Sequence, residues 1–331
     1  MNILNLRDFE SHKSSAVALG FFDGVHLGHQ AVIGKAVQIA RGYGFSSLAF
    51  TMKNHPMSLL KKSSPALINT FEERLELLCS TGVDQVVWTD FDEAFAALTP
   101  REFVAEILSK KLRTAAVAAG LDYRFGAAAA GDIRMLAALG LDLGFKVFAV
   151  EPLFFGKRRI SSTSIRELIA AGEVKTALSL MGRPFFIRGP VIKGEGRGRT
   201  LGFPTANLAF PDEKVTPSEG VYAAWAALRS SRFPAAVSIG TRPTFSGTSS
   251  ALEAHLLDFT GDIYGEKLAL FFMDKIRSQK KFKYPEDLSL QIGRDVETVR
   301  KVLAGYPEGM NSSVLELERY TIRKDVTHDS C

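Results

Sequence analysis

The sequence predicts an α/β domain with a mostly parallel sheet, followed by an antiparallel β domain with a terminal helix. Two observations lead to this prediction. From residue 16 to about residue 150, short apolar runs alternate with amphipathic helical patterns, as they do in βαβ units. Over 185–275 the segments are short, rich in β-branched and aromatic residues, and broken by Gly and Pro. That texture is typical of an antiparallel barrel or sandwich.

The domain boundary is expected near residues 181–184, where two short helical patterns end. We therefore assign residues 1–182 to the first domain and 183–331 to the second, a division that suits the length of the chain. The composition, 46% hydrophobic and 23% charged, is that of an ordinary globular protein. A net charge of +5 suits anionic small ligands and does not by itself argue for nucleic acid.

Within the first domain, strands are expected over apolar runs and helices over stretches with apolar residues at helical spacing. The strand candidates are 16–20, 46–51, 84–88, 114–119 and 145–150, and the helix candidates are 29–42, 71–80, 100–112 and 131–139. The strand candidates of the second domain are 185–192, 220–228, 235–240, 251–259 and 267–276. The last helix is expected over 285–304, and residues 305–331 are polar and weakly patterned, as in a tail.

The stretch GFFDGVHLGHQ, residues 20–30, lies at a predicted strand–loop–helix junction. Exposed backbone N–H groups and the positive end of the helix dipole make such a junction an anion site. His26 and His29 add two imidazoles, and Gly28 between them leaves room for a ligand. Nearby residues complete no familiar metal-ligand set, so phosphate is the better ligand. The alternative is a structural turn with two surface histidines.

Two other polar stretches of the first domain have both a structural and a functional interpretation. Residues 160–164 place four hydroxyl side chains before a helical pattern, where they act as N-caps or as phosphate ligands. Arg166, in the first turn, adds a planar, permanently charged donor that suits phosphate oxygens. The cluster around Asn54 and His55 follows the second strand and either lines the same crevice or is an ordinary loop.

The second domain has its own dense motif, KGEGRGRTLGFPTANL, residues 193–208. Its four glycines allow a ligand to approach the backbone closely, and Arg199 supplies positive charge. Thr205 and Asn207 present oxygens of the kind that Mg²⁺ accepts in phosphate sites. Later in this domain, alternation alone would make Glu253 an outward-facing strand residue.

These motifs resemble those of a known family. HxGH after a strand and ISSTxIR resemble the two signatures of the nucleotidylyltransferases, and FDGVHLGHQ resembles the prokaryotic FAD synthetases. The GxPTAN stretch, together with GTRPTF, ExHLLDF and IRxxxKF, resembles riboflavin kinase. Over residues 15 to about 304, the chain therefore resembles a prokaryotic bifunctional riboflavin kinase/FMN adenylyltransferase. The resemblance implies a Rossmann-like nucleotidylyltransferase domain and a β-barrel riboflavin kinase domain.

The resemblance also implies two ATP- and Mg²⁺-dependent reactions, riboflavin to FMN and then FMN to FAD, and a role for each matching residue. The catalytic residues would be Glu253, as general base of the kinase, with His29 and Arg166 in the first domain. The ATP and phosphate ligands would be Gly20, Phe21, Phe22, Asp23, His26, Gly28, Ser162, Thr163, Gly194, Gly196 and Arg199. The flavin would contact Asn54, His55, Asp122 and Arg277, and Mg²⁺ would bind Thr205 and Asn207.

The sequence departs from the family pattern after Gly126, where four alanines, 127–130, stand in place of the usual basic residues. Two rival functions are weighed. An adenylyltransferase for another small phosphate ester would lack the PTAN domain. A nucleic-acid-binding regulator with a degenerate enzyme core would not need both signature sets.

The expected partners are small molecules, without nucleic acid or membrane, because no apolar run approaches the ~20 residues of a membrane span. The expected location is the cytoplasm: two cysteines, Cys79 and Cys331, make no disulfide framework, and the N-terminus has no signal-peptide pattern. The oligomeric state is left open.

Overall fold

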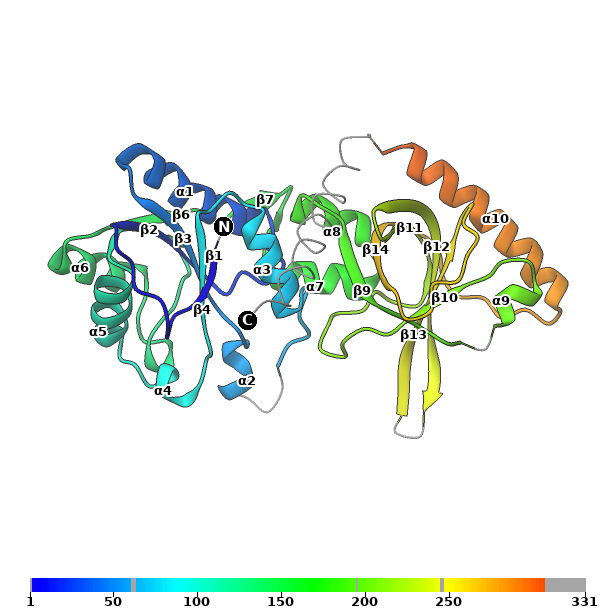
Figure 1. Cartoon of the computed structure of the whole chain (residues 1–331), viewed down its shortest axis with the longest axis horizontal. Coiled ribbons are helices and arrows are strands. Elements are labelled where there is room, and N and C mark those ends of the chain that lie inside the picture. Colours follow the sequence, from blue (N-terminus) through cyan, green and yellow to red (C-terminus); the bar gives the residue numbers. More distant parts are fainter. Residues whose placement is uncertain (1, 61–63, 195, 245–246, 307–331) are drawn as a thin grey trace, which may run out of the picture. The chain divides into compact units, whose positions relative to one another are not determined.

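The computed structural model describes residues 2–60, 64–194, 196–244 and 247–306. The chain forms two compact units, Met1–Ser162 and Thr163–Cys331, and each is described by itself (Figure 1). The division falls earlier than the predicted boundary after residue 182. It assigns the helices α7 (Ser162–Ala171) and α8 (Val174–Met181) almost wholly to the second unit, where α8 contacts barrel strands. The expected tail lies, from residue 307 onward, outside the described residues.

The first unit contains a parallel sheet of six strands. They are β1 (Asn2–Asn5), β2 (Ser15–Leu19), β3 (Ser46–Met52), β4 (Gln85–Thr89), β5 (Thr114–Gly120) and β6 (Lys146–Val150). Their order across the sheet is β1-β4-β3-β2-β5-β6, and every neighbouring pair is parallel. The five predicted strands are confirmed to within one residue at each end. The strand β1 escaped prediction because its four residues, NILN, are half polar and show no clear periodicity.

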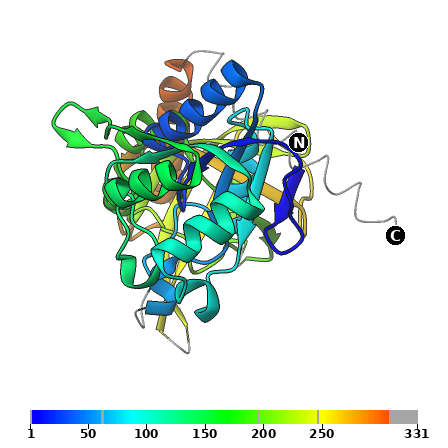
Figure 2. The same cartoon turned by 90° about the vertical axis from the view of Figure 1, so that its left-hand side faces the viewer.

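The helical segments of this unit connect the strands on both faces of the sheet. They are α1 (Leu27–Tyr43), α2 (Pro56–Leu60), α3 (Phe71–Cys79), α4 (Glu93–Ala96), α5 (Pro100–Glu102), the π-helix η1 (Phe103–Lys111), the 3₁₀ turn η2 (Ala127–Ala129) and α6 (Ile133–Leu143). A short hairpin, β7 (Phe154–Phe155) and β8 (Arg158–Arg159), follows and is drawn in green at the upper left of Figure 2. The predicted helix over 100–112 is thus confirmed as α5 and η1, with π-type hydrogen bonding over most of its length.

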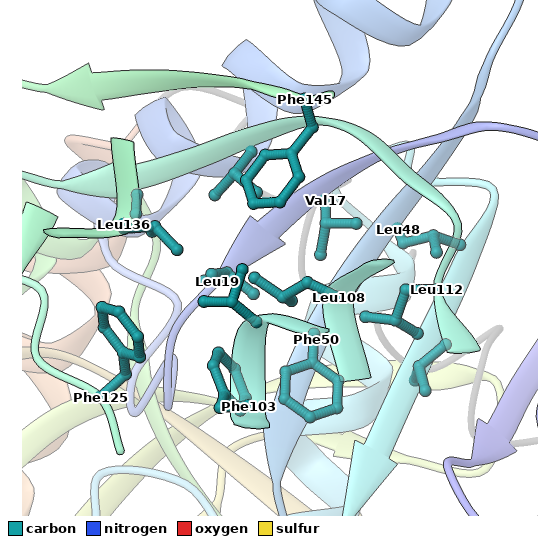
Figure 3. Packing of buried hydrophobic residues seen from close by; sticks show 14 of the residues in the cluster. Val17, Leu19, Leu48, Phe50, Phe103, Leu108, Leu112, Phe125, Leu136 and Phe145 are labelled. Carbon is teal, nitrogen blue, oxygen red and sulfur yellow. The ribbon is translucent and has the colours of Figure 1, made fainter. Parts of the chain in front are cut away.

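Both faces of the central strand β2 are buried, and its alternate residues serve different helices. Ala16 packs in a cluster with Ile39 of α1. Val17 and Leu19 point the other way, into a core shared with Phe103 of η1 (Figure 3). A strand covered on both sides reads as a continuous apolar run rather than an alternating one, which explains why SAVAL is apolar almost throughout.

The strand order reverses at β2, because the strands that follow it in the chain are added first on one side of β2 and later on the other. The chain passes from β2 to its neighbour β3 and later returns to the opposite side of β2 with β5. Ligands of open α/β sheets bind outside the carboxyl ends of the strands at such a switch point. The loop that leaves β2 here, at 20–26, carries five of the predicted ATP ligands, and the loop that leaves β5, at 121–126, carries Asp122, which is predicted to contact flavin.

The second unit contains a closed antiparallel barrel. Its strands are β9 (Phe185–Ile192), β10 (Ala206–Leu208), β11 (Gly220–Leu228), β12 (Ser231–Thr244), β13 (Gly247–Leu256) and β14 (Lys267–Arg277), with the short helix α9 (Arg197–Thr200) between β9 and β10. The order around the barrel is β10-β13-β12-β11-β14-β9, closed by pairing of β10 with β9. Of the barrel and sandwich alternatives, the barrel is therefore confirmed.

Aromatic side chains fill the barrel, and a helix covers it. Tyr222, Phe185 and Phe272 are fully buried, and the ring of Phe272 lies within 6 Å of both others. The helix α10 (Pro285–Ala304) has the bounds predicted from its periodicity. It packs Val299 and Leu303 onto the outer residues of the barrel.

Candidate active sites

The loop that leaves β2 is held in an unusual backbone conformation. Phe22, Gly24 and Val25 have φ values of 59°, 85° and 38°, in the left-handed region. For a bulky or β-branched residue this conformation costs on the order of 1–3 kcal/mol, so surrounding contacts must impose it. Strained backbone of this kind is concentrated at functional sites.

The buried carboxylate of Asp23 holds this loop in place. Its Oδ1 accepts hydrogen bonds from the backbone N–H of Ile68, at 3.0 Å, and of Asn69, at 3.3 Å. Its carbonyl accepts from Ser162 Oγ at 2.9 Å, which joins the first motif to the start of the second one. Asp23 and Ser162 were both predicted to bind ATP. These bonds give them a clear role in shaping the loop, and their contact with ATP stays a prediction.

His26 forms the N-cap of α1. Its Nδ1 accepts a hydrogen bond from the backbone N–H of His29 at 3.2 Å, so in the neutral ring the proton lies on Nε2. The two imidazole rings stack with their centres 3.6 Å apart. A Cβ on Gly28 would lie 3.2 Å from the ring of His26, so this position favours glycine. The predicted histidine pair is therefore one compact unit at the positive end of a helix of 17 residues.

Three causes lower the pKa of His29 well below its ordinary value: burial first, then the charges of His26 and Arg74. At neutral pH the imidazole of His29 is therefore uncharged. Its Nδ1 is enclosed and has no hydrogen-bond partner among the described residues. The ring of Phe22 lies edge-on to the ring of His29, with 5.3 Å between the ring centres. A side chain at residue 20 would collide with the ring of Phe22, so this position favours glycine.

The segment after β3 lies against Phe21 of the same loop. The ring of His55 is edge-on to the ring of Phe21, 4.6 Å between centres, and its Nδ1 accepts from the backbone N–H of Met57. The side-chain amide of Asn54 forms two 3.0 Å hydrogen bonds with the backbone of Phe91. Asn54 thus bonds the loop after β4, and the flavin contacts expected of Asn54 and His55 stay predictions.

Other predicted residues of the first motif set also have protein partners. Asp122, at the end of β5, accepts from Arg159 of β8 at 2.7 Å. Arg166 donates from Nη2 to Oγ1 of Thr163 at 3.3 Å, within α7. The roles assigned to Asp122, Thr163 and Arg166 stay predictions.

The alanine turn at 127–130 is a strained, largely exposed segment. Ala128 and Ala129 have φ values of 53° and 55°, and the backbone N–H of Ala127 donates to Leu98 O at 2.7 Å. A left-handed alanine costs roughly 1–2 kcal/mol, so this hydrogen bond and its neighbours hold the turn against its own preference.

In the second unit, strand register aligns the predicted kinase residues. Asn207 of β10 lies directly opposite Glu253 of β13, and Glu253 lies opposite Ser238 of β12, so the three side chains project on the same side. Thr205 Oγ1 is 3.4 Å from Glu253 Oε2. A Cβ on Gly194 would meet the side-chain amide of Asn207 at 2.1 Å, so only glycine lets this loop pass so closely.

A pocket of about 550 Å³ opens beside this row, a size typical of small-molecule sites. Three predicted residues, Gly196, Arg199 and Thr205, line it. Residues 260–264 also line it, and they carried no motif singled out in the sequence. Glycines at 261 and 265, both with positive φ, mark that loop, and they are the one local signal that a special turn was needed.

His255, two residues after Glu253, has a defined partner. Its Nδ1 lies 2.8 Å from the carbonyl oxygen of Pro204, and because a carbonyl can only accept, Nδ1 carries the proton. His255 therefore holds the residue that precedes Thr205.

Arg277, predicted to contact flavin, forms a bidentate ion pair with the buried Asp295 of α10, at 2.7 and 3.0 Å. This pair joins β14 to α10, and the flavin contact of Arg277 stays a prediction.

Two searches of the described residues bear on the type of site. Within these ranges, no group of three or more His, Cys, Asp or Glu side chains is placed to hold a metal ion. None of the helices described for this chain has the length and apolar character needed to span a membrane.

A parallel α/β unit with a histidine pair at its switch point, and a barrel unit with a glycine-rich loop beside a pocket, are features of a two-site enzyme of nucleotide-dependent group transfer. Comparisons agree with this class. Residues 8–164 match the FAD synthetase family model, and residues 181–303 match the riboflavin kinase family model.

Similar proteins extend over almost the whole chain. The bifunctional riboflavin kinase/FMN adenylyltransferase of Escherichia coli K12 is 38% identical over 287 residues, 86% of this chain and 91% of that one. Its Bacillus subtilis counterpart is 35% identical over 291 residues, 86% and 92% of the two chains. The crystal structure of a protein described as a macrolide-efflux protein from Streptococcus pneumoniae is also similar, with a TM-score of 0.84, 35% identity and coverage of 91% and 98%. The chain belongs to the family of bifunctional riboflavin kinase/FMN adenylyltransferases, which confirms the resemblance of its motifs.

Proposed function

We propose that the chain makes FAD from riboflavin in two steps, each in its own unit. In the second unit, the riboflavin 5′-hydroxyl attacks the γ-phosphorus of ATP, and ADP leaves. In the first unit, a phosphate oxygen of FMN attacks the α-phosphorus of a second ATP, and pyrophosphate leaves. The observation that carries the proposal is the presence of both phosphate-binding constructions in one chain: the capped histidine pair of α1 and the glycine-rich loop beside Glu253.

For the adenylyl transfer, we assign binding and charge stabilisation to the first unit. The N-terminus of α1 and the imidazoles of His26 and His29 would be the donors for the triphosphate. Arg166, which the division of the chain assigns to the second unit, keeps only the role that the family resemblance implies. The chain brings no nucleophilic side chain into this assignment, since the phosphate of FMN is itself the nucleophile. Catalysis then consists of holding the two substrates in line and stabilising the charge that develops on pyrophosphate.

For the kinase reaction, we assign proton removal to Glu253. A carboxylate beside Thr205 and opposite Asn207 is suitably placed to take the proton of a hydroxyl that enters this row. The pocket lined by Gly196 and Arg199 would then hold the nucleotide, with the backbone of the glycine-rich loop around its phosphates.

The residues of the kinase row fit Mg²⁺. A hydroxyl from Thr205 and an amide oxygen from Asn207 are oxygen donors, and Mg²⁺ completes such sets with water and phosphate oxygens. When bound, the ion would neutralise charge on the transferred phosphoryl group. Thr205 and Asn207 would hold and orient it, which leaves Glu253 available for the proton.

We further propose that the enzyme works in the cytoplasm on small molecules, without a nucleic-acid partner. The support for this is its dependence on ATP, its two cysteines and its mild net charge.

The test uses the purified full-length chain with riboflavin, ATP and MgCl₂, and separates the flavins by chromatography. FMN should appear first and then be converted to FAD, with ADP and pyrophosphate as the other products. A chain that accumulates FMN and makes no FAD from it would refute the assignment of the first unit. One that makes FAD from supplied FMN but does not phosphorylate riboflavin would refute that of the second.

A further inference from the structure

Arg74 is a fully buried arginine of the first unit for which the proposed mechanism has no role. It lies in the first turn of α3, which begins with a capping box between Thr70 and Glu73, and none of its surface is exposed. A guanidinium is charged at every pH of interest, and burying it is costly unless its donors and its charge are compensated. Its position therefore calls for an explanation.

The guanidinium joins α3 to the carboxyl end of β3. Its Nη2 donates to the carbonyl oxygens of Met52, at 2.6 Å, and Lys53, at 2.8 Å. These are the last residue of the strand and the first of the segment that leads to His55. One side chain thereby fixes the direction in which this segment leaves the sheet.

The flat face of the same group meets the loop after β2. Its central carbon is 4.0 Å from the ring centre of Phe21, within the range of a cation–π contact. Phe21 in turn contacts the ring of His55. Arg74 thus lies where the ends of β2 and β3 come together, and it contacts the residues leaving both strands.

Arg74 also acts on His29 at a distance. The charged or titratable groups that influence His29 are His26 on its own loop and Arg74 on α3, and both favour the neutral imidazole. The side chain therefore places a permanent positive charge close to the region where the triphosphate is expected. Such a fixed charge needs no reorganisation when negative charge develops on a leaving group.

We propose that Arg74 is a positioning residue for adenylyl transfer: it holds Phe21 and the segment after β3 in one arrangement and supplies a buried positive charge that acts on His29. The inference rests on the proposed function of the first unit. It assigns to α3 a share in the reaction although no side chain of α3 is expected to touch the substrate.

The test compares the full-length wild type with Arg74→Gln, Arg74→Lys and a control, Arg41→Gln, which removes an exposed arginine from the last turn of α1. Conversion of supplied FMN to FAD is measured for kcat, KM and the pH dependence of kcat/KM. Phosphorylation of riboflavin by the same preparation reports on the second unit, and thermal unfolding reports on both.

Arg74→Gln should lower the kcat of FAD formation by about 10²-fold, the scale of a small misplacement of reacting groups, with riboflavin phosphorylation unchanged. Removing a positive charge raises the pKa of His29, so the acid limb of the pH profile should move to higher pH. Arg74→Lys keeps the charge and loses the planar fork, so it should leave the acid limb in place and recover part of kcat. Arg41→Gln should match the wild type in all measurements.

A folded Arg74→Gln chain with wild-type kcat and an unmoved acid limb would overturn the proposal. If the glutamine variant does not fold, Arg74→Lys decides: a reduced kcat with an unmoved acid limb supports the proposal, and an unchanged kcat overturns it. A wild-type chain that makes no FAD would instead refute the proposed function, so the two failures are distinguishable.

Discussion

The imidazole of His29 is the side chain on which the adenylyl transfer is expected to depend most. His29→Ala should remove roughly 2–4 kcal/mol of transition-state stabilisation, the scale of one lost donor aimed at developing charge. The measurement is kcat/KM for FAD formation from supplied FMN. In a coupled assay from riboflavin, FMN should accumulate, because the kinase residues are untouched.

Riboflavin phosphorylation by the same variant is the internal control for folding and handling. Unchanged FAD output in His29→Ala would contradict the assignment of this histidine.

Glu253 and His255 lie two residues apart on β13, and their hydrogen bonds distinguish their expected roles. Glu253→Gln preserves size and removes the base, so FMN formation should fall by about 10²–10⁴-fold while ATP still binds. FMN supplied directly should still become FAD. The assay is riboflavin turnover with saturating ATP, beside an ATP-binding titration.

His255→Gln serves as the matched variant, because its Nδ1 bonds Pro204 and it is expected to affect the kinase only through that loop. Wild-type turnover in Glu253→Gln, combined with loss of turnover in His255→Gln, would transfer the role of base to the histidine.

Periodicity predicted most elements because burial on one or both faces of a sheet leaves a direct trace in sequence. The apolar run of β2 and the pattern of α10 are examples. Side-chain partners left no such trace. The two hydrogen bonds of Asn54 with the backbone of Phe91 join residues 37 positions apart, and the ion pair of Arg277 with Asp295 joins residues 18 positions apart. Spacing alone does not reveal such pairs. Arg74 was missed for the same reason, since a basic residue in an amphipathic helix is ordinarily exposed.

The alanine turn at 127–130 is the element whose chemistry departs most from the family pattern. Ala127→Lys should lower the KM for ATP or FMN in the adenylylation step, because a lysine there restores a positive charge near bound phosphates. The effect should shrink as ionic strength rises. Steady-state kinetics at low and high salt provide the measurement.

Ala138→Lys, at an exposed alanine of α6 in the same unit, is a control for added charge alone. If KM in the Ala127 variant stays at the wild-type value at low ionic strength, the turn does not face the phosphates.

The division of the whole chain into two units predicts that the two activities can be separated, and that the stability of a second-unit fragment depends on the residue at which it begins. Leu178 of α8 is buried with Leu257 and Met273 against the barrel. A fragment of residues 163–331 should therefore fold and phosphorylate riboflavin without making FAD. A fragment of 183–331 lacks Leu178, whose loss alone costs about 2–5 kcal/mol, so it should unfold at a lower temperature.

Thermal unfolding and riboflavin turnover of the two fragments check this prediction. Equal unfolding temperatures would show that α7 and α8 do not stabilise the barrel. A folded but inactive longer fragment would show that the kinase depends on the first unit.

The closed barrel and the open sheet differ in their exposure to unwanted association. Pairing of β10 with β9 closes the ring of strands, so the described ring has no edge strand on which a foreign strand can be added. Beyond Ile239 and before Glu253, β12 and β13 pair only with each other. The parallel sheet ends in β1 and β6, whose outer backbone groups are open to such addition. β1 has four residues, two of them asparagines, and β6 exposes Lys146. Short length and an exposed charge both oppose aggregation through sheet edges, and here they protect the two edges of the open parallel sheet.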